Sequence, residues 1–154
     1  MLKTGMHEEA KMFTKILYPT DFSDVAQKAL KYIEHLKYAG AQEVIILHVI
    51  DTRSLELLVW EPANFRTIEN DLCQEALNKI AFLEKYLVKN GLKVTVRIET
   101  GIPASKILRV EREEHVSIII MGSHGRTNVK DMFLGSVSER VIRHAQTPVL
   151  VVKR

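Results

Sequence analysis

Short apolar strands alternate with amphipathic helices along most of the chain, and this alternation constrains the fold more than any other feature of the sequence. Four apolar runs bounded by turn residues and one alternating apolar–polar run predict five strands. These strands cover residues 15–19, 43–50, 92–98, 117–121 and 148–152. Apolar side chains at helical spacing predict helices over residues 24–39, 68–89, 103–111 and 136–144. Strands that alternate with helices form a parallel sheet covered on both faces, so we predict one α/β domain over residues 13–154.

Three segments depart from this regular alternation. Residues 51–66 show weak periodicity around Trp60 and Pro62, and we expect a long surface loop there with room for a helical turn. Residues 92–98 alternate apolar with polar side chains, which indicates a strand with one solvated face near an edge of the sheet. Residues 1–12 carry several charges and lack the apolar core of a signal peptide, so we expect a short N-terminal extension.

The composition argues against several classes of protein. The formal net charge is +3 at pH 7, and the Lys and Arg residues are scattered among Glu and Asp. A nucleic-acid-binding surface needs clustered basic residues, and no apolar run approaches the roughly 18 residues that span a bilayer. Cys73 is the sole cysteine, which rules out an intrachain disulfide and a cysteine zinc cluster. We expect a cytoplasmic protein that binds neither nucleic acid nor membrane.

Candidate binding residues follow the predicted strands, because ligands of a parallel sheet bind beyond the carboxyl ends of the strands, where the strand order reverses. These candidates are residues 19–21, 48–51, 100–101 and 121–122. The glycines after the fourth strand are the most informative. Gly122 and Gly125 permit positive φ and let the backbone approach a ligand. Nine residues later, Gly135 precedes Ser136 and Glu139, whose spacing is that of a capping box.

The helix that begins at Ser136 offers free N–H groups and the positive end of its dipole to an anion. Together with Gly122 and Gly125, it could wrap a polyphosphate with backbone donors alone. The alternative is that these two glycines form ordinary turns and that Gly135 precedes an ordinary helix cap.

Other known phosphate-binding patterns do not fit the chain. A Walker A motif needs Gly-Lys-Ser/Thr, which is absent. A dinucleotide-binding motif follows the first strand, whereas the glycines here follow the fourth. A phosphoacceptor receiver domain shares the alternating architecture, but its acceptor aspartate follows the third strand, where this chain has Glu99-Thr100.

The pattern Gly122-x-x-Gly125, nine residues, then Gly135-Ser136 resembles the nucleotide-binding motif of the universal stress protein family in its ATP-binding branch. Residues 16–23, 48–51 and 147–152 resemble the first, second and last strands of that family, and the likeness covers residues 13–154. It implies a Rossmann-like α/β fold with a five-stranded parallel sheet in the order 3-2-1-4-5. It also implies an adenine nucleotide held above the first and fourth strands.

The resemblance further implies roles for individual residues. Asp21 would accept hydrogen bonds from the ribose hydroxyls, and the main chain of Val49 would contact adenine. The residues that would line the remainder of the base and ribose site are Pro19, Thr20, Met121 and Gly122. The residues that would hold the phosphates are Gly125, Gly135, Ser136 and Val137. The last strand would pair two copies into a homodimer through Val149, Leu150, Val151 and Val152.

Several polar residues have alternative roles. His124 could donate to a phosphate oxygen and Arg126 could reach the γ-phosphate or a partner chain, but either could be a solvated loop side chain. Asp21 could equally be a turn or cap residue before the first helix. We expect His48 to be a core or crevice histidine. The possible ligands are too few for a dedicated transition-metal site, and magnesium would arrive with the nucleotide.

Phosphoryl transfer needs a positioned nucleophile or base and strong charge stabilisation around the γ-phosphate. The sequence has no recognisable lysine–serine pair or catalytic loop. We therefore expect ATP, with ADP or AMP as alternatives, to act as a ligand. It would stabilise one conformation of a stress-response or signalling module for interaction with a partner. The alternatives are a slow ATPase or phosphotransferase and a dimeric interaction protein that works without nucleotide.

Overall fold

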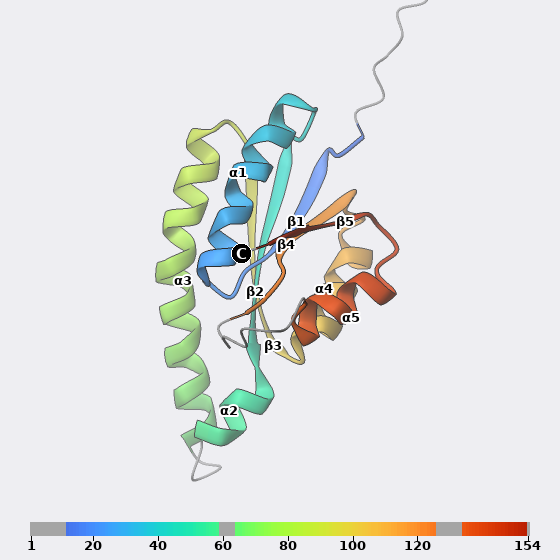
Figure 1. Ribbon diagram of the computed structural model, residues 1–154. Helices are drawn as coiled ribbons and strands as arrows, with labels where there is room; N and C mark the ends of the chain where they lie inside the picture. Colours follow the sequence, from blue (N-terminus) through green and yellow to red (C-terminus); the bar gives the residue numbers. More distant parts are fainter. Residues whose placement is uncertain (1–11, 59–63, 126–133, 154) are drawn as a thin grey trace, which may run out of the picture.

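Five parallel strands form one sheet at the centre of the molecule, in the order β3-β2-β1-β4-β5 (Figure 1). The computed structural model describes residues 12–58, 64–125 and 134–153. The strands are β1 (Lys15–Pro19), β2 (Glu43–Asp51), β3 (Lys93–Gly101), β4 (Ile118–Gly122) and β5 (Val149–Val152). The predicted parallel sheet is confirmed, and so is the strand order that the family resemblance implied.

Helices cover both faces of this sheet. They are α1 (Asp24–Tyr38), α2 (Thr52–Leu58), α3 (Phe65–Lys89), α4 (Pro103–Glu113) and α5 (Ser136–His144). Figure 1 shows α1 and α3 on one side of the sheet and α4 and α5 on the other. Successive side chains of a strand point to opposite faces, so Ile16 and Tyr18 pack in the core beneath α1 and α3, and Leu17 packs beneath α4. The central strands are apolar at successive positions because both faces are buried.

Strand β1 lies where the strand order reverses, with β2 on one side and β4 on the other. Its Tyr18 side chain is fully buried, and the Tyr18 hydroxyl donates a 2.7 Å hydrogen bond to the carbonyl of Ala26 in the first turn of α1. Burial raises the pKa of Tyr18 to about 12, so the hydroxyl keeps its proton at neutral pH. This bond fixes the start of α1 against the end of β1, where a ligand crevice is expected.

The expectation of a surface loop over residues 51–66 was wrong for part of that segment. Thr52–Leu58 forms α2, and α3 begins at Phe65, before the apolar stripe that predicted it; residues 59–63 lie outside the described residues. Asp51 starts α2 by accepting a 3.0 Å hydrogen bond from the backbone N–H of Arg53. The sequence did not show the helical period because apolar residues occur on both faces of α2: Leu55 is fully buried, whereas Leu57 is 84% exposed.

Strand β3 is an edge strand, as its alternating sequence predicted. It is longer than expected and continues to Gly101, paired with β2 from Lys93 onward. All its residues after Lys93 are half-buried, which agrees with a strand that has one neighbour only.

Of the predicted N-terminal extension, residues 1–12, only Met12 belongs to the described part of the chain, and its side chain is exposed. Within the described ranges, no helix is both long and apolar enough to cross a membrane.

Candidate functional site

The loop after β4 and the start of α5 meet beyond the carboxyl end of β4, where they are joined through Ser123. The carbonyl of Ser123 accepts hydrogen bonds from the backbone N–H of Gly135 and the hydroxyl of Ser138, both at 2.7 Å. Its backbone N–H donates to the carbonyl of Val152 at 2.8 Å. Ser123 and Ser138 are almost fully buried. Sequence reasoning missed both serines, although Ser123 lies inside the predicted Gly-x-x-Gly motif.

The predicted capping box at the start of α5 is not formed. Gly135 is the N-cap residue, and no side chain caps the helix. Ser136 is already the first helical residue, while the side chain of Glu139 pairs with Arg143 at 2.9 Å. The box fails because the helix begins one residue earlier than the motif requires, so that Ser136 lies inside the helix instead of at its N-cap. The first N–H groups of α5 are therefore not used by a capping side chain, which is the arrangement that an anion site needs.

The three loop glycines permit close packing rather than an unusual backbone. None of them has a φ in the left-handed region, so that part of the prediction was wrong. A Cβ at Gly122 would lie 3.1 Å from the backbone nitrogen of Ala26, and a Cβ at Gly135 would lie 3.3 Å from the carbonyl oxygen of Ser123. A Cβ at Gly125 would lie 2.9 Å from Oδ2 of Asp21. The glycines thus bring the loop against the start of α1 and against Asp21.

Asp21 is a turn residue and also faces the glycine loop, so the two interpretations from the sequence are compatible. Its Oδ1 accepts a 3.0 Å hydrogen bond from the backbone N–H of Ser23. Ser23 in turn caps α1 as predicted, since its hydroxyl accepts from the N–H of Ala26 at 3.3 Å. The structure therefore brings Asp21, Gly122 and Gly125 together at the point where β1 and β4 end.

Thr20 uses its polar atoms to hold the turn after β1. Its N–H donates to the carbonyl of Leu47 at 2.9 Å, and its hydroxyl accepts from the N–H of Phe22 at 3.1 Å. Its carbonyl lies 2.8 Å from Nδ1 of His48, and because a carbonyl can only accept, Nδ1 carries the proton. His48 is buried at the crevice, as expected.

Phe22 is a third site residue that sequence reasoning missed. Its φ is 65°, in the left-handed region, and its ring centroid lies 4.6 Å from that of His48. Nζ of Lys79, from α3, lies 5.4 Å from the Phe22 ring centroid. The signal available in the sequence was an aromatic residue inside a turn, flanked by Asp21 and Ser23.

The remaining predicted residues differ in their placement. Met121 and Pro19 are buried, Met121 within the core beneath α4 and α5. Val49 and Val137 are half-buried and pack against the same core. Nδ1 of His124 lies 2.9 Å from the hydroxyl of Ser123. Arg126, proposed for the γ-phosphate, lies outside the described residues.

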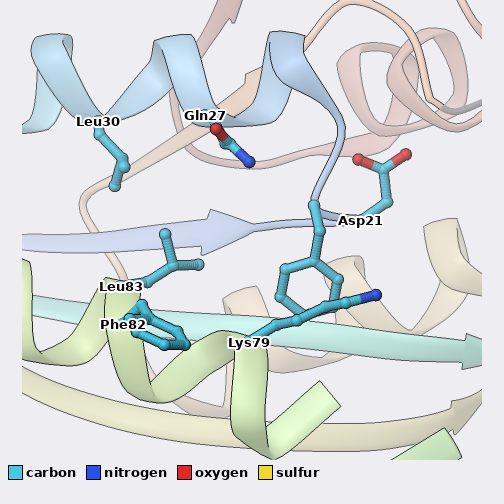
Figure 2. Close-up of a pocket in the computed structure, with 7 residues that line it drawn as sticks. Asp21, Gln27, Leu30, Lys79, Phe82 and Leu83 are labelled. Carbon is cyan, nitrogen blue, oxygen red and sulfur yellow. The ribbon is translucent and has the colours of Figure 1, made fainter. Parts of the chain in front are cut away.

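A hollow of about 560 Å³ opens beside the crevice, between α1 and α3. The residues that line it are Asp21, Phe22, Gln27, Leu30, Lys79, Phe82 and Leu83. Figure 2 shows Gln27 and Leu30 of α1 facing Lys79 and Leu83 of α3, with Asp21 at one end. Asp21 is the only residue shared with the predicted site. Across the described parts of the chain, no three His, Cys, Asp or Glu side chains gather closely enough to hold a metal ion.

The chain is similar to known proteins over nearly its whole length. The model of the universal stress protein family matches residues 12–153. Universal stress protein MJ0577 of Methanocaldococcus jannaschii is 46% identical, over 93% of this chain and 96% of that protein. Universal stress protein YxiE of Bacillus subtilis is 35% identical, over 92% of this chain and 100% of YxiE.

Solved structures show the same fold. The structure of MJ0577 matches with a TM-score of 0.85 at 48% identity, covering 93% of this chain and 97% of that one. A universal stress protein from Archaeoglobus fulgidus, in complex with dAMP, matches with a TM-score of 0.65 at 21% identity, covering 92% of this chain and 99% of that one. From the family match and the relatives together, the chain belongs to the universal stress protein family.

Proposed function

We propose that the chain binds an adenine nucleotide, ATP or else ADP or AMP, in the crevice between β1, β4 and the start of α5. The observation that carries the proposal is that no side chain caps the first turn of α5. Gly125 and Gly135, which have no side chains, lie next to this turn. Unused N–H groups at a helix N-terminus, approached through glycine, form a phosphate site.

In this proposal, the phosphates bind the main chain of the glycine loop and of α5, and the ribose binds next to them at the turn after β1. Gly125, Gly135, Ser136 and Val137 hold the phosphates, with His124 and Arg126 as further donors. Asp21 would repel a phosphate, so its carboxylate is suited to the ribose hydroxyls. Adenine contacts the main chain of Val49, and Pro19, Thr20, Met121 and Gly122 form the floor. Magnesium, where present, arrives bound to the phosphates.

The ligand class has independent support. The fold holds dAMP in the Archaeoglobus fulgidus protein, so an adenine nucleotide is the first ligand to test. Calorimetry with ATP is expected to give saturable binding to the wild-type protein. Gly135→Val is expected to abolish it, because the added side chain occupies the approach to α5. Ser105→Val, at an exposed position in the first turn of α4, is a control for valine near a helix start. ATP binding that survives Gly135→Val would disprove the phosphate assignment.

The nucleotide acts here as a ligand that stabilises one conformation for interaction with a partner in a stress response. Phosphoryl transfer would require a positioned base and charge stabilisation at the γ-phosphate. Asp21, the carboxylate at the turn after β1, is held by the N–H of Ser23. Incubation with radiolabelled ATP is therefore expected to give no more product than the Gly135→Val variant gives. Steady turnover above that control would make the protein an ATPase or phosphotransferase.

We also propose that two copies pair through β5. This strand is at an edge of the sheet, and the carbonyls of Pro148 and Val152 bond to β4 and the loop after it. Alternate residues of a strand face opposite neighbours, so the backbone groups of Val149 and Val151 face away from β4. Light scattering is expected to give the mass of a dimer for the wild type and of a monomer for Val151→Pro. A dimeric Val151→Pro variant would place the interface elsewhere.

A further inference from the structure

Phe22 has a backbone conformation that its side chain opposes. A φ of 65° brings the Cβ of a bulky residue close to a carbonyl oxygen, which is why glycine and asparagine are preferred there. Such a conformation persists only when the surrounding structure enforces it, and it concentrates at functional sites. Of the described residues other than glycine, only Phe22 and His115 have a positive φ, and His115 lies at the end of α4, away from the crevice.

The ring of Phe22 supplies the contacts that enforce this conformation. It packs against the apolar core beneath α1 and α3. On one side it contacts the ring of His48, at 4.6 Å between centroids, and His48 is itself fixed by its bond to the carbonyl of Thr20. Nζ of Lys79 lies 5.4 Å from the Phe22 ring centroid, a distance at which a cation attracts an aromatic face.

The conformation of Phe22 determines where Asp21 points. The hydroxyl of Thr20 accepts from the N–H of Phe22, and Oδ1 of Asp21 accepts from the N–H of Ser23, so the two bonds bracket the Phe22 backbone. Rotation of φ at Phe22 would turn the N–H of Ser23 away from Asp21. With that bond in place, Oδ2 of Asp21 lies beside Gly125.

We infer that Phe22 is a positioning residue of the nucleotide site. Its ring, held by His48, the apolar core and Lys79, keeps the turn after β1 in the left-handed conformation that fixes the Asp21 carboxylate beyond the end of β1, where the proposed site places the ribose hydroxyls. This inference rests on the proposed function, because it requires a nucleotide whose ribose meets Asp21.

The test compares the binding of ATP with that of 2′,3′-dideoxy-ATP, which lacks the ribose hydroxyls. We expect the wild type to prefer ATP by roughly tenfold and Asp21→Ala to bind both nucleotides alike, since each hydrogen bond to a charged group contributes severalfold in affinity. Phe22→Gly keeps the left-handed conformation accessible but removes the ring. It is expected to lose the preference for ATP as Asp21→Ala does, while its affinity for dideoxy-ATP stays within about twofold of wild type. Phe22→Tyr retains the ring and is expected to retain the preference.

Each other outcome contradicts a specific statement. A Phe22→Gly variant that keeps the wild-type preference, or that loses affinity equally for both nucleotides, would show that Phe22 does not act through Asp21. A wild type that binds both nucleotides alike would remove the ribose role of Asp21, and with it this inference. A wild type that binds neither nucleotide would overturn the proposed function itself. Thermal unfolding of each variant identifies those that fold, and Phe22→Asn replaces Phe22→Gly if the glycine variant does not.

Discussion

Around the central strands β1 and β4, the amino and carboxyl ends of the sheet are held together by different chemistry. At the amino ends of the strands, carboxylates make the connections: Lys15 at the start of β1 pairs with Glu114 at 3.0 Å, and Glu111 anchors the turn before β5. At the carboxyl ends of β1 and β4, the connections run through the hydroxyls of Thr20 and Ser138 and the main-chain carbonyl of Ser123. Asp21 is the carboxylate that the described residues place there.

This difference predicts that the amino end contributes to the stability of the fold and that the carboxyl end also contributes to nucleotide binding. Carboxylates at the amino end make strong charge-assisted bonds but make that end sensitive to acid. Neutral hydrogen bonds at the carboxyl ends of β1 and β4 leave few fixed anions there to repel a phosphate. Variants that break the carboxylate bonds at the amino end should therefore change the free energy of unfolding and leave nucleotide affinity unchanged. Variants that disturb the packing or hydrogen bonds at the carboxyl ends of β1 and β4 should change both.

The largest expected effect is at the amino end. Oε1 of Glu111, a nearly fully buried residue, accepts from the N–H groups of Gln146 and Thr147 at 2.7 Å and from the Thr147 hydroxyl at 2.8 Å. Glu111→Ala leaves these donors without an acceptor and is expected to lower the free energy of unfolding by about 3 kcal/mol. Urea unfolding measures this change, and Glu111→Gln, which keeps one acceptor oxygen, should lose less. A change in ATP affinity for a folded Glu111→Ala variant would contradict the separation of the two ends.

At the carboxyl end, Gly122 is expected to be the most sensitive position. The methyl group of Gly122→Ala would lie 3.0 Å from Cγ1 of Val25 and 3.1 Å from the backbone nitrogen of Ala26. Backbone cannot move as a side chain can, so we expect a loss of about 2 kcal/mol in the free energy of unfolding. Gly125→Ala is the matched control, because among the described residues its methyl group meets only the carboxylate of Asp21. If urea unfolding gave the same loss of unfolding free energy for both variants, close packing against the backbone of α1 would not be the reason that Gly122 is a glycine.

Ser138 and Ser136 test which serine holds the start of α5. Ser138→Ala removes the hydroxyl bonds to the carbonyls of Ser123 and Gly135 and is expected to cost about 1.5 kcal/mol. Ser136→Ala should change stability by less than about 0.5 kcal/mol, because Ser136 is exposed and does not cap the helix. Thermal unfolding of both variants measures the contrast. A larger loss of stability in Ser136→Ala than in Ser138→Ala would indicate that Ser136 caps the helix, as the capping box predicted.

The smallest expected effect is the acid sensitivity of the amino end. The hydrogen bond from Lys15 lowers the pKa of Glu114, with Arg97 adding to the effect. A carboxyl with a lowered folded pKa stabilises the protein above its unfolded pKa of about 4.3, and this contribution is lost as the pH falls through the lower folded pKa. Urea unfolding between pH 6 and pH 3 should therefore show a decline that is shallower in Lys15→Met. An identical decline in both proteins would exclude this pair as a source of acid sensitivity.

The sequence was sufficient for the sheet because burial on both faces produces unmistakable apolar runs. Those runs predicted β1, β2, β4 and β5, whereas the alternating pattern of residues 92–98 predicted β3 and its place near an edge. Helix α2 was missed because a short helix that buries few side chains has no visible period. The strand order came from resemblance to a family, since hydropathy does not specify which strands are neighbours.

The candidate site was only partly predictable. Glycine spacing pointed to the loop after β4, but the glycines permit contacts between segments distant in sequence, such as Gly125 with Asp21, rather than a special φ. Those contacts have no local signature. The roles of Ser138 and Phe22 depend in the same way on Ser123 and His48, which only the folded chain brings within reach.

The 2.7 Å hydrogen bond from the N–H of Gly135 to the carbonyl of Ser123 fixes both ends of the segment 124–134 to one point. The entropy of closing a chain segment rises only slowly with its length, by roughly 0.6 kcal/mol for each doubling. Residues could therefore be inserted into this segment at small thermodynamic cost without moving the strand or the helix that it joins. Evolution can thus vary the length of this segment while the strand and the helix that it joins keep their places.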